Sequence, residues 1–374
     1  MNFFRNLFRK KSTIRKTDLT RRFDLISRIG QGSMSKVWRA RDTMSGRIVA
    51  LKVLDRVKTL RFESRFVGLN KPSEGTVAIQ LKHPHIVRTN ESGVTLDDEQ
   101  FLVMEFISGV SLSYLVDVQN DIMQQRRLTF IVQLGEAIDY FHRQNWIHRD
   151  LCPRNVLLDE NYDVKLIDFG LAVPNTAEFR KPGNRTGTAN YMAPELIKRQ
   201  TTDQRIDLFS YAVSCFEMYT QRLPWEGAET LEMVVQHINK PAVDIREIVP
   251  DIDEQVAATI MKGLEGNPRN RWSSAREMVT EFREARKRLG QEPEGDEERY
   301  AAFHTEQRYT ATVTAETASA SRRSKPETAD TDVDANTGVE HVPSQKQPED
   351  EHYYRAEVHG FDDDDDDDDE YEEV

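Results

Sequence analysis

The sequence contains little cysteine and no long apolar run. Only Cys152 and Cys215 occur among 374 residues, too few for a disulfide framework, which favours a reducing compartment. No stretch approaches the roughly 20 apolar residues that span a bilayer, and no secretory leader with a central apolar core is present. We therefore expect a cytoplasmic protein, at most peripherally attached to a membrane, with one large domain or two modest ones.

Charge is distributed unevenly along the chain. Residues 291–374 carry 27 acidic and 7 basic side chains, a net of −20, which leaves +7 for residues 1–290 out of the whole-chain charge of −13. Low hydrophobicity and high like charge, including the run Asp362 to Asp369, predict a disordered acidic tail over residues 289–374. A solvated tether is the simplest role for this tail, and an electrostatic regulator is the alternative.

The first 20 residues have the opposite character and form a basic leader with interspersed apolar side chains. The first 16 residues contain no acid, and their basic residues are Arg5, Arg9, Lys10, Lys11, Arg15 and Lys16. Four apolar residues would fall on roughly one side of a helix, namely Phe3, Phe4, Leu7 and Phe8. Such a pattern over residues 1–16 can lie at an anionic membrane surface, where each basic residue contributes about 1 kcal/mol. A frayed, solvated leader is the alternative.

Residues 21–288 alternate apolar and polar stretches without low complexity, as a folded domain does. Strand-like patterns come first, are separated by turn signals, and cover residues 23–27, 36–40 and 47–54. From about Ser111 onward, apolar residues recur at helical spacing instead, for example over 128–141 and 208–218.

The order of these patterns predicts an α+β fold of two lobes. The smaller lobe, about residues 21–104, is expected to be β-rich with one main helix. The larger lobe, about residues 108–288, is expected to be helical. The two lobes would face one another across a cleft.

Three short segments carry the chemical signal. Residues 148–155 read His-Arg-Asp-Leu-Cys-Pro-Arg-Asn, residues 168–170 read Asp-Phe-Gly, and residues 193–195 read Ala-Pro-Glu. One such segment could arise by chance, but three in this order place a proton acceptor, two magnesium ligands and a substrate platform within one stretch.

The residue types in these segments suit their expected chemistry. Asp150 would accept or orient the proton of an attacking hydroxyl. Asn155 and Asp168 would hold Mg²⁺, with Mn²⁺ as an alternative, because oxygen ligands suit a hard cation. An isolated His-Arg-Asp is usually surface polarity, but the spacing to the other two residues makes that interpretation remote.

A glycine-rich segment and a strand lysine complete the pattern. Residues 30–37, Gly-Gln-Gly-Ser-Met-Ser-Lys-Val, lie between two predicted strands, and their glycines would let backbone N–H groups approach phosphates. Lys52 lies on a strand otherwise made of core residues, and a buried ammonium needs an anionic partner such as ATP phosphates or a helix carboxylate. Glu74 and Glu63 are the candidate carboxylates, and the family resemblance that these motifs carry favours Glu74, because it implies a glutamate ten residues before Pro84.

With these motifs, residues 21–288 resemble a eukaryotic-type (Hanks-type) Ser/Thr protein kinase, and the Gly-Ser-Met-Ser-Lys-Val segment is most similar to that of bacterial members. The resemblance implies transfer of the ATP γ-phosphoryl group to protein Ser or Thr hydroxyls, with autophosphorylation in the activation segment. The catalytic residues implied are Asp150, Lys52, Arg154 and Asn155. The nucleotide-binding residues implied are Gly30, Gly32, Ser33, Val37, Ala50, Lys52, Glu74, Met104, Glu105, Ile107 and Leu157. Protein substrates are the expected partners, nucleic acid is not, and homodimerisation is an option for activation.

The sequence departs from the family pattern at Ser35, at Cys152 and at Ala212, where a glycine is usual. Ser35 stands where a third glycine is usual, and Cys152 stands where Ser/Thr kinases usually carry a lysine that stabilises the transferring phosphate. Tyrosine kinases place an arginine four residues after the catalytic aspartate, and Arg154 occupies that position. We predict that Arg154 supplies the missing charge as a planar fork. Residues 186–195 nevertheless match the Ser/Thr form, in which Thr188 bonds to the catalytic aspartate.

The resemblance also implies structural and regulatory residues. Glu195 would pair with Arg271 and fix the substrate platform, and Asp207 would anchor the catalytic-loop backbone. Arg149 indicates activation by a phosphate in the activation segment, with constitutive activity as the alternative. The candidate acceptors, in order of preference, are Thr186 and Thr176.

Two other functions share parts of this pattern. A pseudokinase that binds ATP as a scaffold or signalling module is the main alternative, and Cys152 and Ser35 argue faintly for it. The presence of Lys52, Glu74, Asp150, Asn155 and Asp168 argues against it. A small-molecule phosphotransferase would lack the platform and its threonine, which residues 186–195 supply.

Overall fold

The computed structural model describes residues 16–31, 34–66, 68–183, 186–225 and 240–291, all within one structural unit. The predicted nucleotide-binding residues Gly32 and Ser33 lie outside the described residues. So do residues 1–15 of the leader and the predicted disordered tail from residue 292 onward.

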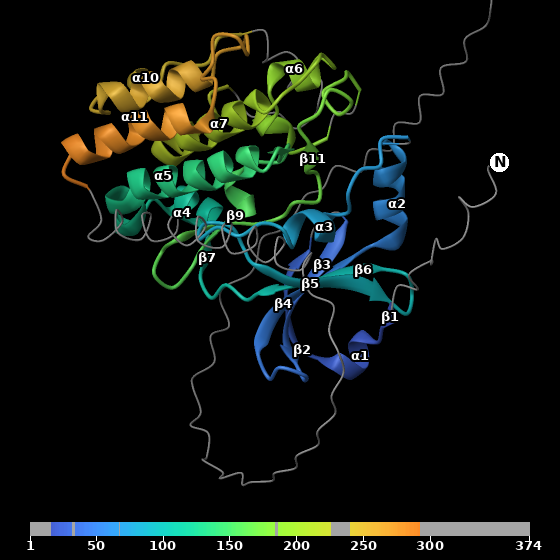
Figure 1. Cartoon of the computed structure of the whole chain (residues 1–374). Coiled ribbons are helices and arrows are strands. Elements are labelled where there is room, and N and C mark those ends of the chain that lie inside the picture. Colours follow the sequence, from blue (N-terminus) through green and yellow to red (C-terminus); the bar gives the residue numbers. More distant parts are fainter. Residues whose placement is uncertain (1–15, 32–33, 67, 184–185, 226–239, 292–374) are drawn as a thin grey trace, which may run out of the picture. The chain divides into compact units, whose positions relative to one another are not determined.

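The small lobe is built on one six-stranded sheet with the order β1-β5-β6-β4-β3-β2 (Figure 1). Its strands are β1 (Lys16–Thr17), β2 (Phe23–Gln31), β3 (Ser35–Asp42), β4 (Ile48–Leu54), β5 (Thr89–Thr95) and β6 (Gln100–Glu105). The pairings are antiparallel except for β1, which runs parallel to β5. Two residues that we assigned to the leader therefore belong to this sheet, where Lys16 also pairs with Asp98 at 2.7 Å.

Three short helices accompany the sheet: α1 (Leu19–Arg22), α2 (Arg56–Ser64) and α3 (Glu74–Ala78). The chain is not helical between α2 and α3, because Gly68 and Asn70 have positive φ angles of 81° and 48°. Pro72 follows, and Ser73 caps α3 by accepting a hydrogen bond from the backbone N–H of Thr76. This interruption places Glu74 in the first helical turn, where a carboxylate is favoured.

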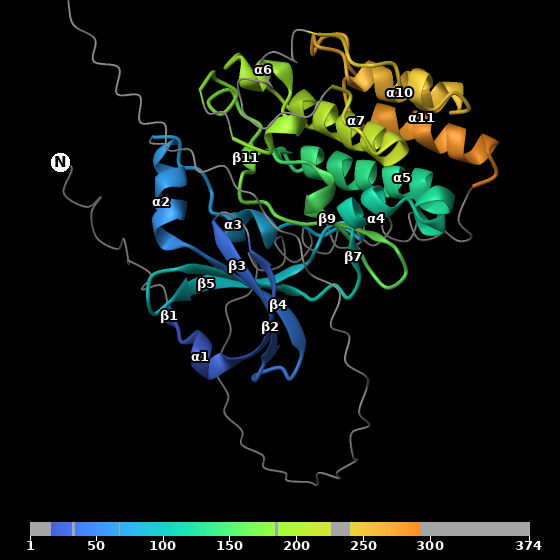
Figure 2. The same cartoon turned by 180° about the vertical axis from the view of Figure 1, so that it is seen from behind.

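The large lobe is mainly helical. Its helices are α4 (Leu112–Val118), α5 (Asp121–Arg143), α6 (Pro194–Ile197), α7 (Arg205–Thr220), α9 (Ile245–Ile248), α10 (Glu254–Gly263) and α11 (Ala275–Arg288). Its short strands are β7 (Val110–Ser111), β8 (Trp146–Ile147), β9 (Val156–Leu158), β10 (Val164–Leu166) and β11 (Val173–Pro174), and two 3₁₀ turns are η1 (Pro153–Asn155) and η2 (Ala189–Tyr191). Figures 1 and 2 both show α5 with α7 and α11 beside it.

The core of the large lobe forms where α5 meets α7 and α11. Gly135 on α5 permits this packing, because a Cβ atom there would lie 2.6 Å from the Tyr211 hydroxyl. That hydroxyl is buried and donates a hydrogen bond of 2.6 Å to the carbonyl of Ile131. The same apolar cluster includes Val77 on α3 and Leu81, so it extends into the small lobe, where a separate cluster around Phe23, Leu51 and Phe101 packs within the sheet. Across the described ranges, no helix has the length and apolarity that a bilayer crossing needs.

Candidate active site

Lys52 on β4 lies at the centre of a buried charge cluster. Its Nζ is 2.7 Å from Glu74 Oε1 and 3.0 Å from Asp168 Oδ1. The Lys52 and Glu74 side chains are only 6% and 5% exposed, whereas that of Asp168 is 41% exposed. One cation thus faces two carboxylates, and the less buried carboxylate is the one next to the cleft.

The pKa values of the two carboxylates reflect the fact that they share one cation, Lys52. Burial raises the pKa of Glu74, although Lys52 opposes the shift. Burial also opposes ionisation of Asp168, but Lys52 and the backbone N–H of Gly170 hold its pKa below its usual value. The competing carboxylate, Glu63, instead accepts a hydrogen bond of 3.2 Å from Gln100 Nε2. The structure therefore pairs Lys52 with Glu74.

Asp150 is held by the activation segment and the catalytic loop together. Its Oδ1 accepts hydrogen bonds from both the backbone N–H and the hydroxyl of Thr188, each at 2.8 Å. Its Oδ2 accepts one from Asn155 Nδ2 at 3.0 Å, and the same amide donates to the Asp150 carbonyl at 2.8 Å. These bonds fix the carboxylate in one orientation, as a general base requires.

The backbone at two positions near Asp150 and Asn155 adopts energetically unfavourable conformations. Arg149 and Asp168 have positive φ angles of 70° and 63°, which non-glycine residues rarely adopt. Such strain persists where surrounding bonds over-determine the backbone. At Arg149 this support comes from Asp207, whose carboxylate accepts hydrogen bonds from the backbone N–H groups of His148 and Arg149 at 2.8 and 2.9 Å.

Asp207 on α7 is itself deeply buried and fully engaged. Besides the two backbone bonds, it is 2.8 Å from Nε2 of His142. Burial opposes its ionisation, but the bonds from His142 and His148 hold its pKa below the usual value. Burial lowers the pKa of His148, whose Nδ1 accepts the backbone N–H of Asp150 at 3.3 Å. The imidazole of His148 is therefore neutral and helps to position Asp150.

Cys152 places a neutral, buried group where a lysine would be usual. Its Sγ lies 3.8 Å from the hydroxyl of Thr188. Burial, assisted by the charge of Asp150, raises the pKa of the thiol to about 12. The side chain cannot supply positive charge to a transferring phosphate and remains an unreactive thiol at neutral pH.

Arg154 in η1 is the nearest exposed cation on the same loop. Within the described ranges, no hydrogen bond or ion pair is found for its guanidinium, but its charge acts on Cys152, Tyr191 and Glu217. The Tyr191 hydroxyl donates a hydrogen bond of 2.5 Å to Glu217 Oε2. Burial raises the pKa of Glu217. The Arg154 charge therefore acts on groups that lie both on its own loop and on other segments packed against it.

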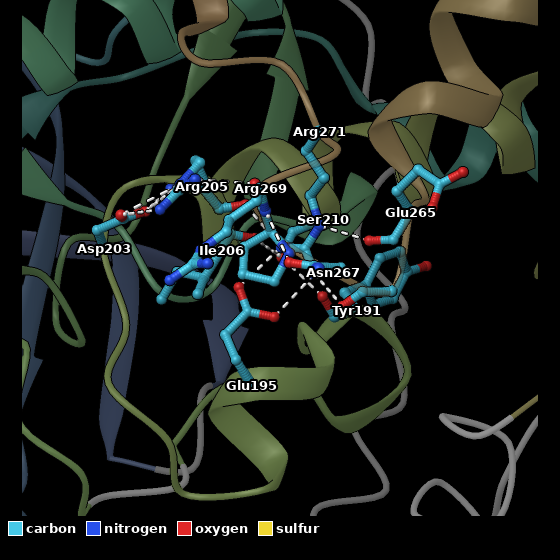
Figure 3. A network of polar contacts seen from close by, with 12 residues as sticks. Tyr191, Glu195, Asp203, Arg205, Ile206, Ser210, Glu265, Asn267, Arg269 and Arg271 are labelled. Atoms are coloured by element: carbon cyan, nitrogen blue, oxygen red, sulfur yellow. Dashed lines mark hydrogen bonds and ion pairs between the residues drawn. The ribbon is translucent and has the colours of Figure 1, made fainter.

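The substrate platform rests on a buried ion pair between Glu195 on α6 and Arg271 (Figure 3). The two Arg271 Nη atoms donate to the two carboxylate oxygens at 2.7 and 2.8 Å, and the side chains are 0% and 3% exposed. The remaining Arg271 donors reach the carbonyls of Glu265, Arg205 and Gly266. Every guanidinium nitrogen is therefore satisfied, as a buried arginine requires.

The two candidate phosphoacceptors differ in accessibility. Thr186 is 8% exposed, and its hydroxyl has no hydrogen-bond partner within the described residues. Gly187 follows with a φ of 134°, and a Cβ atom there would lie 2.5 Å from the Arg149 carbonyl, so the segment passes very close to the catalytic loop. Thr176 is half-buried and bonds to Glu178, whose pKa it lowers. In this conformation Thr176 is the more accessible of the two.

The predicted nucleotide-binding residues that the structure describes lie on neighbouring strands of the small-lobe sheet, on α3, at the connection between the lobes and on β9. Gly30 lies opposite Val37 in the β2–β3 pair, Val37 lies opposite Lys52 in the β3–β4 pair, and Ala50 lies opposite Met104 in the β4–β6 pair. The backbone N–H of Glu105 donates to the Arg88 carbonyl, Ile107 is buried after β6, and Leu157 is half-buried on β9. A cavity of about 110 Å³ lies at the charge cluster and is lined by Lys52, Glu74, Asp150 and Asp168, among others.

The donor set fits a magnesium ion that is shared with phosphates. Among the side chains that the structure describes, no group of three or more His, Cys, Asp or Glu could hold a metal by itself. Asp168 and Asn155 supply two oxygen donors, and Mg²⁺ is usually held by one or two protein oxygens together with phosphate and water. The carboxylate excess around Lys52 also favours an added cation.

Lys71 is a cleft residue that the sequence patterns do not single out. It lines the same cavity and donates a hydrogen bond of 3.2 Å to the carbonyl of Gly170. The available signal was weak, since it consists of one lysine three residues before Glu74 in a segment without helical periodicity.

Comparison with known proteins agrees with this geometry. A family model described as the protein kinase domain matches residues 23–282, and the chain belongs to that family. This confirms the resemblance found in the sequence and the expected two-lobed α+β fold.

Bacterial proteins are among the relatives found. A probable serine/threonine-protein kinase of Streptomyces coelicolor is 33% identical over 269 residues, which cover 69% of this chain and 39% of that protein. A probable serine/threonine-protein kinase of Clostridium perfringens is 30% identical, with 72% and 39% covered. The serine/threonine-protein kinase PknB of Mycolicibacterium smegmatis is 31% identical, with 70% and 42% covered. The chain spans about two-fifths of the length of these relatives.

Proposed function

We propose that the protein is an ATP- and Mg²⁺-dependent Ser/Thr protein kinase. The observation that carries the proposal is the contact between Asp150 and both polar groups of Thr188, in the same cleft as the Lys52–Glu74–Asp168 cluster. The first contact ties the proton acceptor to the platform that presents a protein hydroxyl. The Lys52–Glu74–Asp168 cluster supplies the charges needed to hold a triphosphate and its metal.

In the proposed reaction, the acceptor hydroxyl loses its proton to Asp150 as its oxygen forms a bond to the γ-phosphorus. The bond between that phosphorus and the β–γ bridging oxygen breaks, and ADP leaves with the electron pair. Lys52 would hold the phosphates of ATP, and Asp168 and Asn155 would hold the metal. When bound, Mg²⁺ neutralises the developing charge on the phosphate oxygens.

Arg154 would supply positive charge that Cys152 lacks. Two features support this role: the Cys152 thiol is neutral and buried, and the Arg154 guanidinium has no described partner that would occupy it. Thr188 supports Ser/Thr specificity, because its hydroxyl meets the catalytic carboxylate directly.

Regulation and location belong to the same proposal. Autophosphorylation would reach Thr176 in the described conformation, whereas Thr186 requires the activation segment to move because its hydroxyl is buried. Protein substrates are the partners, and residues 1–16 would attach the protein to an anionic membrane surface from the cytoplasm. Co-sedimentation with vesicles that contain or lack anionic lipid tests the attachment, and light scattering tests homodimerisation.

A transfer assay tests the central proposal. Full-length wild type, Asp150→Asn and Arg154→Ala are incubated with Mg²⁺, γ-labelled ATP and a general basic protein, and the labelled amino acids are identified. We expect phosphoserine or phosphothreonine in the wild type and none with Asp150→Asn. Nucleotide binding without any transfer by the wild type would favour a pseudokinase instead.

A further inference from the structure

Lys71 connects the small lobe to the start of the activation segment. It lies in the non-helical stretch between α2 and α3, where Asn70 has a positive φ and Pro72 follows. Its Nζ donates to the carbonyl of Gly170 at 3.2 Å and approaches that of Pro72 at 3.4 Å. Gly170 stands 99 residues further along the chain and is the second residue after Asp168.

The Lys71 ammonium also lies over two aromatic rings. Nζ is 5.2 Å from the ring centroid of Phe62 on α2 and 5.9 Å from that of Phe66. These two rings meet edge to face at 5.3 Å, and Phe66 in turn contacts Phe179 of the activation segment at 6.0 Å. Because a cation over a ring face is attracted by the ring quadrupole, the aromatic pair holds Lys71 in place.

The carbonyl that Lys71 holds is close to the catalytic cluster. A Cβ atom on Gly170 would lie 3.3 Å from both Asp168 Oδ1 and Glu74 Oε2, so this backbone passes beside both carboxylates. Burial lowers the pKa of Lys71, while the charges of Glu74 and Glu63 oppose that shift. Lys71 also lines the cavity that contains Lys52 and Asp150. Its charge, hydrogen bond and packing therefore converge on the backbone that carries the metal ligand.

We propose that Lys71 is a positioning residue for phosphoryl transfer. By holding the Gly170 carbonyl against the segment that precedes Glu74, it keeps the Asp168 backbone in its strained conformation and within reach of Lys52. Lys71 and Glu74 lie three residues apart, so one short segment supports Asp168 through the backbone and through Lys52. The inference rests on the proposed kinase function.

The test compares Lys71→Met and Lys71→Arg with the wild-type full-length protein. Methionine keeps an unbranched side chain over the aromatic rings but can neither donate a hydrogen bond nor carry charge. We expect kcat to fall about tenfold, as for the loss of a hydrogen bond from a charged donor, with KM for the protein substrate unchanged. Arginine retains both properties and should restore kcat to within about threefold of wild type.

Amide hydrogen exchange supplies a readout that does not depend on catalysis. It is measured without nucleotide in the Asp150→Asn background, so that autophosphorylation does not differ between samples. We expect Lys71→Met to accelerate exchange over residues 168–180, because the backbone loses its attachment to the small lobe. This measurement separates the present inference from the proposed function, since it remains decisive in a protein that transfers no phosphate.

Lys262 offers a matched control. Its Nζ lies 3.6 Å from the ring centroid of Trp272 in the large lobe, so Lys262→Met also removes a cation from an aromatic face, but away from the cleft. The kcat of the Lys262→Met variant should equal that of wild type, and in the Asp150→Asn background its amide exchange over residues 168–180 should be unchanged. The proposal is overturned if Lys71→Met keeps wild-type kcat and exchange, if Lys71→Arg is as impaired as Lys71→Met, or if only KM changes.

Discussion

The Glu195–Arg271 pair of the platform and the Lys52 cluster of the cleft are both buried, but their designs are opposite. In the platform, Arg271 meets one carboxylate, Glu195, and its remaining donors bond to backbone carbonyls, so that the pair is closed and saturated. In the cleft, Lys52 meets two carboxylates, and one of these, Asp168, is 41% exposed. The first arrangement leaves no capacity for a ligand, and the second leaves a negative charge beside a cavity.

This difference shows how a structural ion pair can be distinguished from a functional one. A buried pair costs desolvation energy that is offset only when every donor and acceptor is satisfied. The platform pair meets this condition within the protein. In the cleft cluster one cation faces two carboxylates, so the charges are not balanced within the protein, and burial together with the charge of Asp168 raises the pKa of Glu74. We therefore expect changes in the cleft to affect catalysis and changes in the platform to affect stability.

The largest effect is expected for Asp150→Asn on the cleft side. Loss of the general base should lower kcat by about 10²- to 10⁴-fold, because asparagine cannot accept the hydroxyl proton. The melting temperature should fall only modestly, since the amide oxygen can still accept from both groups of Thr188, and only the single bond from Asn155 Nδ2 is lost because an NH2 group replaces its acceptor. Steady-state kinetics and thermal unfolding measure the two quantities. Asp24→Asn, at an exposed position of β2, is the control and should leave both unchanged. A large loss of stability with Asp150→Asn would break the comparison.

The next largest effect is expected in the platform. Arg271→Met leaves Glu195 buried without its cation and should lower the free energy of unfolding by about 3–5 kcal/mol. Urea unfolding measures this loss. Arg269→Met, at an exposed position of the same segment, should have almost no effect. The double variant Arg271→Met with Glu195→Leu should recover part of the stability, because it removes the unpaired charge. A cost under about 1 kcal/mol would show that water reaches Glu195.

A smaller effect is expected at Arg154. Arg154→Ala should lower kcat about tenfold or more if this guanidinium supplies the charge that Cys152 lacks. In a Cys152→Lys background, the same change should cost less, because the lysine restores the usual source of charge. Single-turnover rates at saturating ATP measure the effect of Arg154→Ala in the wild-type and in the Cys152→Lys background. Equal rates for wild type and Arg154→Ala would contradict the prediction that Arg154 replaces the charge of the usual lysine.

The smallest effect concerns pH and His148. Burial lowers its pKa from the ordinary value of 6.5, so the unfolded chain binds a proton that the folded protein does not. Its contribution to stability is complete above pH 6.5 and is lost as the pH falls below 6.5 through the folded-state pKa. His148→Gln should therefore flatten the decline of the unfolding free energy between pH 7.5 and 5.5, by at most about 1.4 kcal/mol per pH unit. Identical slopes for both proteins would contradict a neutral buried imidazole.

Much of the fold and of the site can be predicted from the sequence, because the informative residues are close together in the chain. The strand pattern at 23–27 lies within β2, and the helical pattern at 128–141 lies within α5. Asp150, Asn155 and Asp168 lie within 19 consecutive residues, so their spacing alone indicates their chemistry.

Other features depend on long-range contacts and could not be predicted in this way. The bond from Lys71 to Gly170 joins residues 99 positions apart, and the burial of Thr186 depends on how the activation segment folds onto the catalytic loop. The break between α2 and α3 follows from backbone angles at Gly68 and Asn70 that their residue types permit but do not require.

The sequence by itself determined the protein kinase family and the two lobes and predicted Lys52, Asp150 and Asp168 as cleft residues, because side-chain chemistry and hydrophobic periodicity are local properties of the chain. Only the tertiary structure decided that Lys52 pairs with Glu74 and not Glu63, that Cys152 is a neutral buried thiol, and that Lys71 reaches Gly170. The physical reason is the same in each case. Pairing, burial and pKa depend on which distant groups the fold brings within a few ångströms, and no local pattern encodes that distance.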